Sequence, residues 1–290
     1  MFDRKKFLED GLIKLPGALL DVSEFREFII DLVWTGESVL ANRRVDREGN
    51  LPLDEASERL SDILIKLRDT NGKGRLFGAL FSQPGKLLSL SYLRQHPVLI
   101  EPIKHIFGSK SVIAFPQMSD ALTTFFNIRD NTGKLDQSLP VHQDYPYMMQ
   151  SSSQLVIWIP LIKHHPQTGS IEFWRGSQSK GIAKQVVHGE YYEVAPDEVQ
   201  KYELETGNSS ELLEWELGDI IIFNSNLFHR TIPNVSDDHV RAIQVFRASD
   251  LNEGDGLDYA WRSTRYVDGN STNPKHADFK SIHQEFVESE

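Results

Sequence analysis

The chain has 290 residues, of which 39% are hydrophobic and 25% charged, a balance typical of a folded globular protein. Its net charge of -11 disfavours nonspecific binding to nucleic acid or to an anionic membrane surface, because both need a basic face. Cysteine is absent and neither a signal peptide nor an apolar run of the ~20 residues that span a membrane is evident, so a cytoplasmic location without disulfides or thiolate ligands is expected.

The first 110 residues are predicted to be mainly helical. Apolar residues recur at helical spacing in two segments, at Phe25, Phe28, Ile29, Leu32 and Val33 and again at Leu60, Ile63, Leu64 and Leu67. Ser23 is the expected N-cap of the first helix, and a third helix is predicted from Pro97 to Phe107, ending at Gly108. Turns or loops are expected at Pro16-Gly17, at 41–52 and at Asn71-Gly72.

The pattern changes after residue 110 to short segments rich in β-branched and aromatic residues. Strands are predicted at 111–114, 123–128, 154–161, 170–174, 219–224 and 240–247. Because no long helices separate them, an antiparallel sandwich or barrel is favoured over a parallel sheet. Residues 185–216 should interrupt the strands, with a short helix opening at Pro196.

We therefore predict one domain over residues 1–290, of the mainly β class with flanking helices. Residues 1–110 form its helical layer and residues 111–250 its β core. Residues 251–290 read as a polar, loosely structured tail with at most one terminal helix.

The motif Val141-His142-Gln143-Asp144-Tyr145 organises the chemistry of the chain. In an extended backbone, positions i and i+2 share one face, so His142 and Asp144 point the same way and offer two ligands to a divalent metal. A third ligand must come from elsewhere, and His229 is the candidate. His239 is a rival, although it lies in a polar turn. Two histidines and one carboxylate on one face make the facial triad of non-haem Fe(II) sites.

Several basic residues follow the candidate third ligand. Arg241 lies on the returning strand, which we expect beside the strand of His229, and its guanidinium suits bidentate pairing with a carboxylate. Arg247 shares its strand face and is the fallback, whereas Arg230 should face away from His229. The adjacent pair His164-His165 should point apart and is not expected to bind a metal.

These features together resemble a known family. The order and approximate spacing over residues 110–250 are similar to the phytanoyl-CoA dioxygenase family of Fe(II)/2-oxoglutarate oxygenases, on the strength of His142-Gln143-Asp144, the segment 169–177, Gly218-Asp219, His229 and Arg241. The resemblance implies a double-stranded β-helix, or jelly roll. It makes His142, Asp144 and His229 the metal ligands, Arg241 the anchor of 2-oxoglutarate, and Trp158 a lining residue of the co-substrate site.

Some further assignments extend the resemblance. Asn127, on the strand before the metal motif, is a candidate hydrogen-bond partner of the co-substrate. Tyr145, Tyr147 and Met148 follow the motif and either wall the substrate pocket or pack beneath a loop.

The resemblance implies a dioxygenase that uses Fe(II), 2-oxoglutarate and O2 to hydroxylate, or otherwise oxidise, an unactivated C–H of a small molecule in a biosynthetic pathway, releasing succinate. Asp144, where related halogenases carry a small residue, implies hydroxylation rather than halogenation. No Lys/Arg cluster reads as a coenzyme A phosphate site, so a free small molecule is expected. Two alternatives are a cupin-like metalloenzyme without 2-oxoglutarate, which leaves Arg241 without a task, and a non-catalytic jelly-roll ligand-binding protein.

Overall fold

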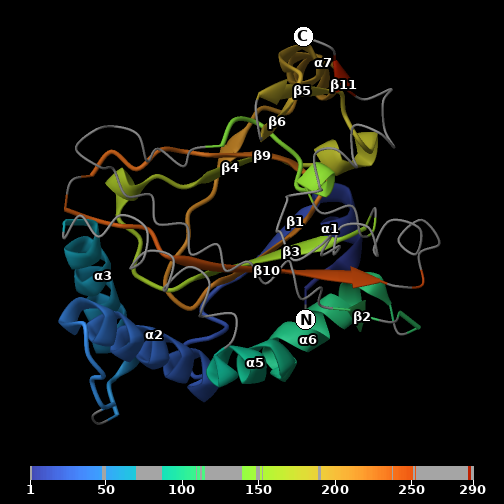
Figure 1. The fold of residues 1–290 in the computed structure, drawn as a ribbon. Helices are drawn as coiled ribbons and strands as arrows, with labels where there is room; N and C mark the ends of the chain where they lie inside the picture. Colours follow the sequence, from blue (N-terminus) through green and yellow to red (C-terminus); the bar gives the residue numbers. More distant parts are fainter. Residues whose placement is uncertain are drawn as a thin grey trace, which may run out of the picture.

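In a computed structural model of the full chain, most of the N-terminal helices lie along one side of two β layers, and a later helix lies at the opposite side (Figure 1). The residues described are 2–47, 50–69, 87–108, 110–111, 113–114, 139–147, 151, 153–188, 191–236, 238–250, 252 and 287–288.

The helices gather mainly in the N-terminal part of the chain. They are α1 (Arg4–Asp10), α2 (Ser23–Ala41), α3 (Leu53–Asp69), α5 (Leu88–Gln95), α6 (Pro97–Phe107) and the later α7 (Pro196–Thr206). Proline at the start of α6 costs no hydrogen bond, and Gly108 ends the helix, as predicted. All the apolar residues of the two predicted stripes are buried on α2 and α3. No described helix is both long and apolar enough to cross a membrane.

A five-stranded antiparallel sheet forms the centre of the molecule. Its strand order is β1-β8-β3-β10-β2, with bounds β1 (Leu12–Leu15), β8 (Ile220–Asn224), β3 (Leu155–Pro160), β10 (Ile243–Asp250) and β2 (Ile113–Ala114). β3 is central, since it pairs with β8 on one side and β10 on the other. All six residues of β3 are buried, as expected for a strand covered on both faces.

Successive side chains of β3 and β8 point to opposite faces of the central sheet, so they belong to two separate hydrophobic clusters. Ile157 and Ile222 belong to a cluster with the side chains of α2, α3, α5 and α6. Their sequence neighbours Trp158 and Phe223 belong to a second cluster, which lies toward the smaller sheet. Because side chains alternate across a strand, the same two strands hold the helical layer on one face and build an inter-sheet core on the other.

Two three-stranded sheets complete the β structure. The sheet that faces the central one has the order β7-β4-β9, with β7 (Glu211–Leu212), β4 (Ile171–Trp174) and β9 (Phe228–Thr231). The other has the order β11-β5-β6, with β11 (Val287–Glu288), β5 (Gln185–His188) and β6 (Tyr191–Val194). Apart from the parallel pair β11–β5, every pairing in these two sheets is antiparallel.

The structure corrects several predictions for the N-terminal region. Ser23 is not the N-cap of α2: Val22 holds that position without a side-chain bond, and the Ser23 hydroxyl bonds Glu24 instead. The strand β1 was missed, and so were α1 and α5. β1 is only four residues long, and it forms by pairing with β8 far along the chain rather than by local propensity.

The region 185–216 and the tail also differ from expectation. The predicted helix at Pro196 is present as α7, but β5, β6 and β7 show that strands continue through this region. In the tail, the terminal pair Val287–Glu288 forms a strand and not a helix. The predicted strand at 123–128 and the predicted helix end at Asn71-Gly72 lie outside the described residues.

Candidate metal centre

Backbone hydrogen bonds bring the two halves of the predicted metal site together. His142 and His229 form an isolated antiparallel bridge, with His142 N donating to His229 O at 2.8 Å and His229 N to His142 O at 3.1 Å. The amide of Asp144 donates to Ser225 O at 2.7 Å, just after the end of β8. The His-x-Asp motif is therefore fixed to β9 at one residue and to the end of β8 at the other.

The three side chains converge as the sequence predicts. Asp144 Oδ1 lies 3.6 Å from His142 Nε2 and 3.8 Å from His229 Nε2. One ligand atom from each residue lies within 4.8 Å of the others, and all three residues are buried. A single ion with bonds of about 2 Å can draw such atoms together with small movements of the side chains. The donor set, two imidazole nitrogens and one carboxylate, suits a non-haem Fe(II) ion.

The other ring nitrogen of each histidine fixes its tautomer. His142 Nδ1 lies 2.8 Å from Pro140 O, and His229 Nδ1 lies 2.8 Å from Leu227 O. Because a carbonyl oxygen only accepts, each Nδ1 carries the hydrogen and each neutral ring has its lone pair on Nε2. Both histidines thus present the nitrogen that a metal needs, and backbone carbonyls hold the rings in place.

Charge in the site is also set for metal binding. Burial, together with nearby His142, lowers the pKa of His229 to about 3, so its ring stays neutral at physiological pH. Burial alone would raise the pKa of Asp144, but the guanidinium of Arg247 and the contact with His142 hold that pKa well below its usual value. The aspartate is therefore an anion.

A cavity adjoins the three residues between the two β layers. It is lined by the three candidate ligands, by Arg241 and Arg247, by Trp158 and Thr231, and by apolar side chains of β3, β4, β8 and β10. Its volume of about 40 Å³ holds a few water molecules, so a dicarboxylate needs lining side chains to shift.

Arg241 reaches this cavity by a different route from the one predicted. It precedes β10, which pairs with β3 and β2 in the central sheet, so it does not lie on a strand beside β9. The chain after β9 crosses to the other layer of the sandwich instead of forming a hairpin. Arg241 is only 1% exposed, and its Nη1 donates to Ser170 O at 2.9 Å.

The remaining pocket predictions divide into three groups. Trp158 lines the cavity, and its role at a co-substrate site stays a prediction. Neither Tyr145 nor Tyr147 lines this cavity. The Tyr147 ring packs edge-on against His142, and its hydroxyl bonds the backbone of Tyr192. Asn127 and Met148 lie outside the described residues.

Thr231 is a lining residue that the sequence reading missed. It lies two positions after His229 on β9, so the same period of two that relates His142 to Asp144 could have identified it.

The rival candidates are accounted for by other contacts. The rings of His164 and His165 have different partners, since His164 packs at a tilt against Trp215 and His165 stacks on His239. His239 is thereby held away from the three converging residues, which are the one such group found in the described part of the chain. Arg230 pairs with Glu172 on the side away from the site, as predicted.

Gln143, between the two candidate ligands, secures the motif from the opposite face. Its amide nitrogen donates to Gly181 O at 2.8 Å and to Asn226 O at 2.6 Å. Its oxygen accepts from Ala183 N at 3.0 Å and from Gln185 Nε2 at 3.1 Å. All four hydrogen-bonding positions of this buried amide are therefore filled, and the backbone between His142 and Asp144 is fixed.

We expect Gln143→Leu to lower the free energy of unfolding by about 2–4 kcal/mol, because buried groups such as Ala183 N and Gly181 O lose their partner at about 1–3 kcal/mol each. Urea unfolding measures the loss. Gln95→Ala is the control, since Gln95 is exposed at the end of α5 and its side chain bonds, among the described residues, only Ser91 one turn earlier. It should change stability by no more than about 0.5 kcal/mol. Similar values for both variants would contradict a fastening role for Gln143.

Two facing antiparallel β layers with a buried His-x-Asp…His set between them define the class of non-haem iron oxygenases with a jelly-roll core. A sequence profile of the phytanoyl-CoA dioxygenase (PhyH) family matches residues 54–243, and the chain belongs to this family. The predicted family and fold class are thus confirmed. Iron and 2-oxoglutarate are the cofactor and co-substrate of the class.

Individual relatives agree with this assignment. The 1-deoxypentalenic acid 11-beta-hydroxylases of Streptomyces arenae and Streptomyces exfoliatus are 27% and 28% identical over 140 and 141 residues. Each match covers 48% of this chain, and it covers 45% and 46% of the relatives, so the similarity spans about half their length. The epimerase SnoN in complex with Fe3+, alpha ketoglutarate and nogalamycin RO has the same fold, at 14% identity and a TM-score of 0.55, over 93% of this chain and 91% of that one.

Proposed function

We propose that this protein is an Fe(II)/2-oxoglutarate-dependent dioxygenase that hydroxylates a small molecule in a biosynthetic pathway. His142, Asp144 and His229 hold the iron, and Arg241 anchors the distal carboxylate of 2-oxoglutarate. When bound, the iron and its co-substrate supply the activation of O2 and the oxidation of the substrate C–H, with release of succinate. The protein contributes the ligand geometry and, next to it, a small cavity walled by apolar side chains together with Arg241 and Arg247.

The proposal that 2-oxoglutarate is the co-substrate rests on the charge and the hydrogen bonding of Arg241. Burial lowers its pKa to about 10, so it is a cation at physiological pH. Its only hydrogen bond within the described residues goes to the neutral Ser170 carbonyl, and its Nε is buried without a partner. A buried charge without a counter-charge is costly, and a carboxylate in the adjoining cavity would compensate it.

The same observation weighs against the two alternative functions. A cupin-like enzyme without 2-oxoglutarate, or a ligand-binding protein without iron, gives no reason for a buried guanidinium that has no counter-charge among the described residues and lies beside the His142, Asp144 and His229 set. Arg247 is a weaker anchor than Arg241, because it already pairs with Asp144.

The substrate class rests on the relatives and on charge. The two hydroxylases that this chain resembles act, by their names, on 1-deoxypentalenic acid, so we propose a hydroxylation of a comparably small, free molecule. No basic surface for nucleic acid is expected at a net charge of -11. A chain without cysteine suits an enzyme of the cytoplasm.

Anaerobic titration with Fe(II) and then 2-oxoglutarate tests the proposal. The wild type should develop the weak visible absorption band of the iron–2-oxoglutarate chelate. Arg241→Ala should need about 10- to 100-fold more 2-oxoglutarate for the same band, because it loses a charge-assisted bond worth about 1.5–3 kcal/mol. Arg241→Lys should lie between the two, since lysine keeps the charge but not the bidentate geometry.

Arg230→Ala provides the control for charge alone, because Arg230 is next to His229 in sequence yet pairs with Glu172 on the outer face. It should titrate like the wild type. If the protein binds iron but the chelate absorption band appears at no 2-oxoglutarate concentration, 2-oxoglutarate is not the co-substrate, and the cupin-like alternative is favoured.

A further inference from the structure

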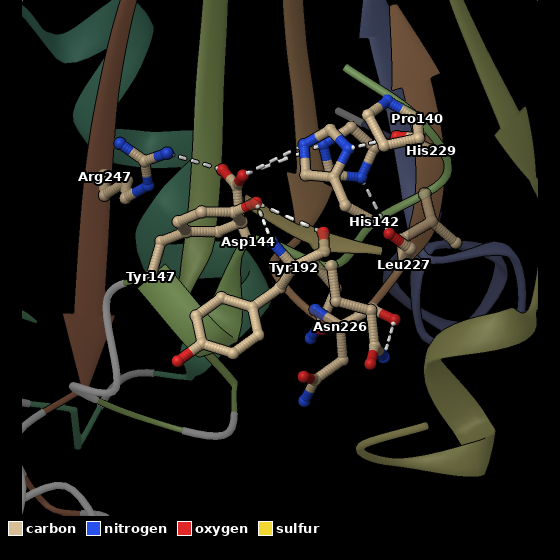
Figure 2. A network of polar contacts seen from close by, with 11 residues as sticks. Pro140, His142, Asp144, Tyr147, Tyr192, Asn226, Leu227, His229 and Arg247 are labelled. Atoms are coloured by element: carbon tan, nitrogen blue, oxygen red, sulfur yellow. Dashed lines mark hydrogen bonds and ion pairs between the residues drawn. The ribbon is translucent and has the colours of Figure 1, made fainter. Parts of the chain in front are cut away.

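The two oxygens of the Asp144 carboxylate have different partners. Oδ1 faces His142 and His229, at 3.6 and 3.8 Å from their Nε2 atoms. Oδ2 accepts a hydrogen bond of 2.6 Å from Nη2 of Arg247. Figure 2 shows Arg247 and the two histidines on opposite sides of the carboxylate. The group is therefore held in one orientation, with a single oxygen toward the metal position.

Arg247 holds Asp144 from the central sheet. It lies on β10, opposite Val156 of β3, whereas His229 belongs to β9 in the facing sheet. Its side chain is 13% exposed and that of Asp144 is 10% exposed, so the pair is shielded from solvent. An ion pair that solvent screens so little constrains its partner more strongly than one on the surface.

We propose that Arg247 is a positioning residue that keeps Asp144 a monodentate ligand. The inference rests on the proposed metal site. A facial set of three protein ligands leaves three octahedral positions free, two for a chelating 2-oxoglutarate and one for O2. A carboxylate that turned to bind through both oxygens would take one of these positions. By occupying Oδ2, Arg247 prevents that turn and orients Oδ1.

The role of Arg247 can be tested by measuring the affinity of the protein for a metal ion, which needs no catalytic turnover. Anaerobic titration with Co(II) should give about 10- to 100-fold weaker binding for Arg247→Met than for the wild type, the usual effect of removing a partner of a ligating side chain. Arg247→Lys should recover part of the affinity, because an ammonium still donates to Oδ2. Arg230→Met removes a nearby charge that does not touch Asp144, so it should bind Co(II) like the wild type.

A second measurement covers the case in which Arg247→Met fails to fold because Asp144 is left buried and unpaired. In Asp144→Ala, added formate can replace the lost carboxylate between the metal and Arg247. We expect formate to strengthen Co(II) binding in Asp144→Ala by at least about 10-fold. It should do nothing in Asp144→Ala/Arg247→Met, a variant that loses both charges and leaves neither unpaired.

The outcomes separate this inference from the metal site itself. Equal rescue by formate in the single and the double variant, or wild-type Co(II) affinity in Arg247→Met, would overturn the role of Arg247 and leave the metal site standing. Absence of Co(II) binding in the wild type would overturn both.

Discussion

Replacing His229 with alanine is expected to weaken Fe(II) binding by at least about 100-fold and to reduce 2-oxoglutarate-dependent succinate formation to background. In the proposed site His229 is one of three protein ligands, and loss of a mere partner of a ligand already costs about 10- to 100-fold. The buried ring is neutral and presents Nε2 to the site, so no charge is removed by the substitution. Anaerobic Fe(II) titration and succinate release measure the two effects.

His239→Ala is the matched control for this experiment. His239 was the rival third ligand in the sequence, but its ring stacks on His165. Its removal should leave Fe(II) binding unchanged. If His239→Ala lost the metal while His229→Ala kept it, the assignment of the third ligand would be wrong.

The sequence predicted those parts of the fold that depend on local pattern. The apolar stripe of α2 and the proline and glycine at the ends of α6 mark helices whose signals lie within a few turns. β3 and β8 were also predictable, because they are apolar enough to be buried on both faces. β10 was predicted at 240–247 but runs from Ile243 to Asp250.

The elements that were missed depend on partners far along the chain. β1 has only four residues and forms against β8, in a register that pairs Leu12 with Phe223. β7 has two residues and exists because β4 offers an edge to it. Short strands of this kind have no periodicity to detect, since tertiary pairing and not propensity decides them.

In the candidate site, too, the features set by local pattern were predictable and those set by tertiary contacts were not. The common face of His142 and Asp144 followed from the strand period, but the bridge that sets His229 opposite His142 is a tertiary contact. Arg241 lines the cavity beside the three residues, but the prediction that it lies on a strand next to that of His229 was wrong, because a chain leaving β9 can return to either sheet of a sandwich. The ion pair between Arg247 and Asp144 could not be predicted from the sequence for the same reason.

Gly169 links the stability of the fold to the site, because the next residue, Ser170, holds Arg241 through its carbonyl oxygen. Its φ of 72° and ψ of 177° fall in a region that is essentially limited to glycine. A Cβ at this position would lie 2.1 Å from Ile232 O and 2.6 Å from Pro233 O, both of them backbone atoms that cannot rotate away. The next residue, Ser170, accepts hydrogen bonds through its carbonyl from Arg241 and from the Ile232 amide.

We therefore expect Gly169→Ala to lower the free energy of unfolding by about 2–6 kcal/mol, from backbone strain of about 1–3 kcal/mol and a steric clash of similar size. Any folded fraction should also bind 2-oxoglutarate more weakly, because relief of the clash moves Ser170 O away from Arg241. Urea unfolding and the 2-oxoglutarate titration measure the two consequences.

Gly108→Ala separates the clash from the strain. Gly108 has a φ of 108°, but a Cβ there meets no heavy atom within 4 Å in the described structure. It should cost only the strain, about 1–3 kcal/mol, and leave 2-oxoglutarate binding intact, because it lies at the end of α6 and not beside the site. If Gly169→Ala lost no more stability than Gly108→Ala, the clash of a Cβ with the 232–233 backbone would not be what requires glycine at position 169. If it lost stability but bound 2-oxoglutarate normally, Ser170 would not be what seats Arg241.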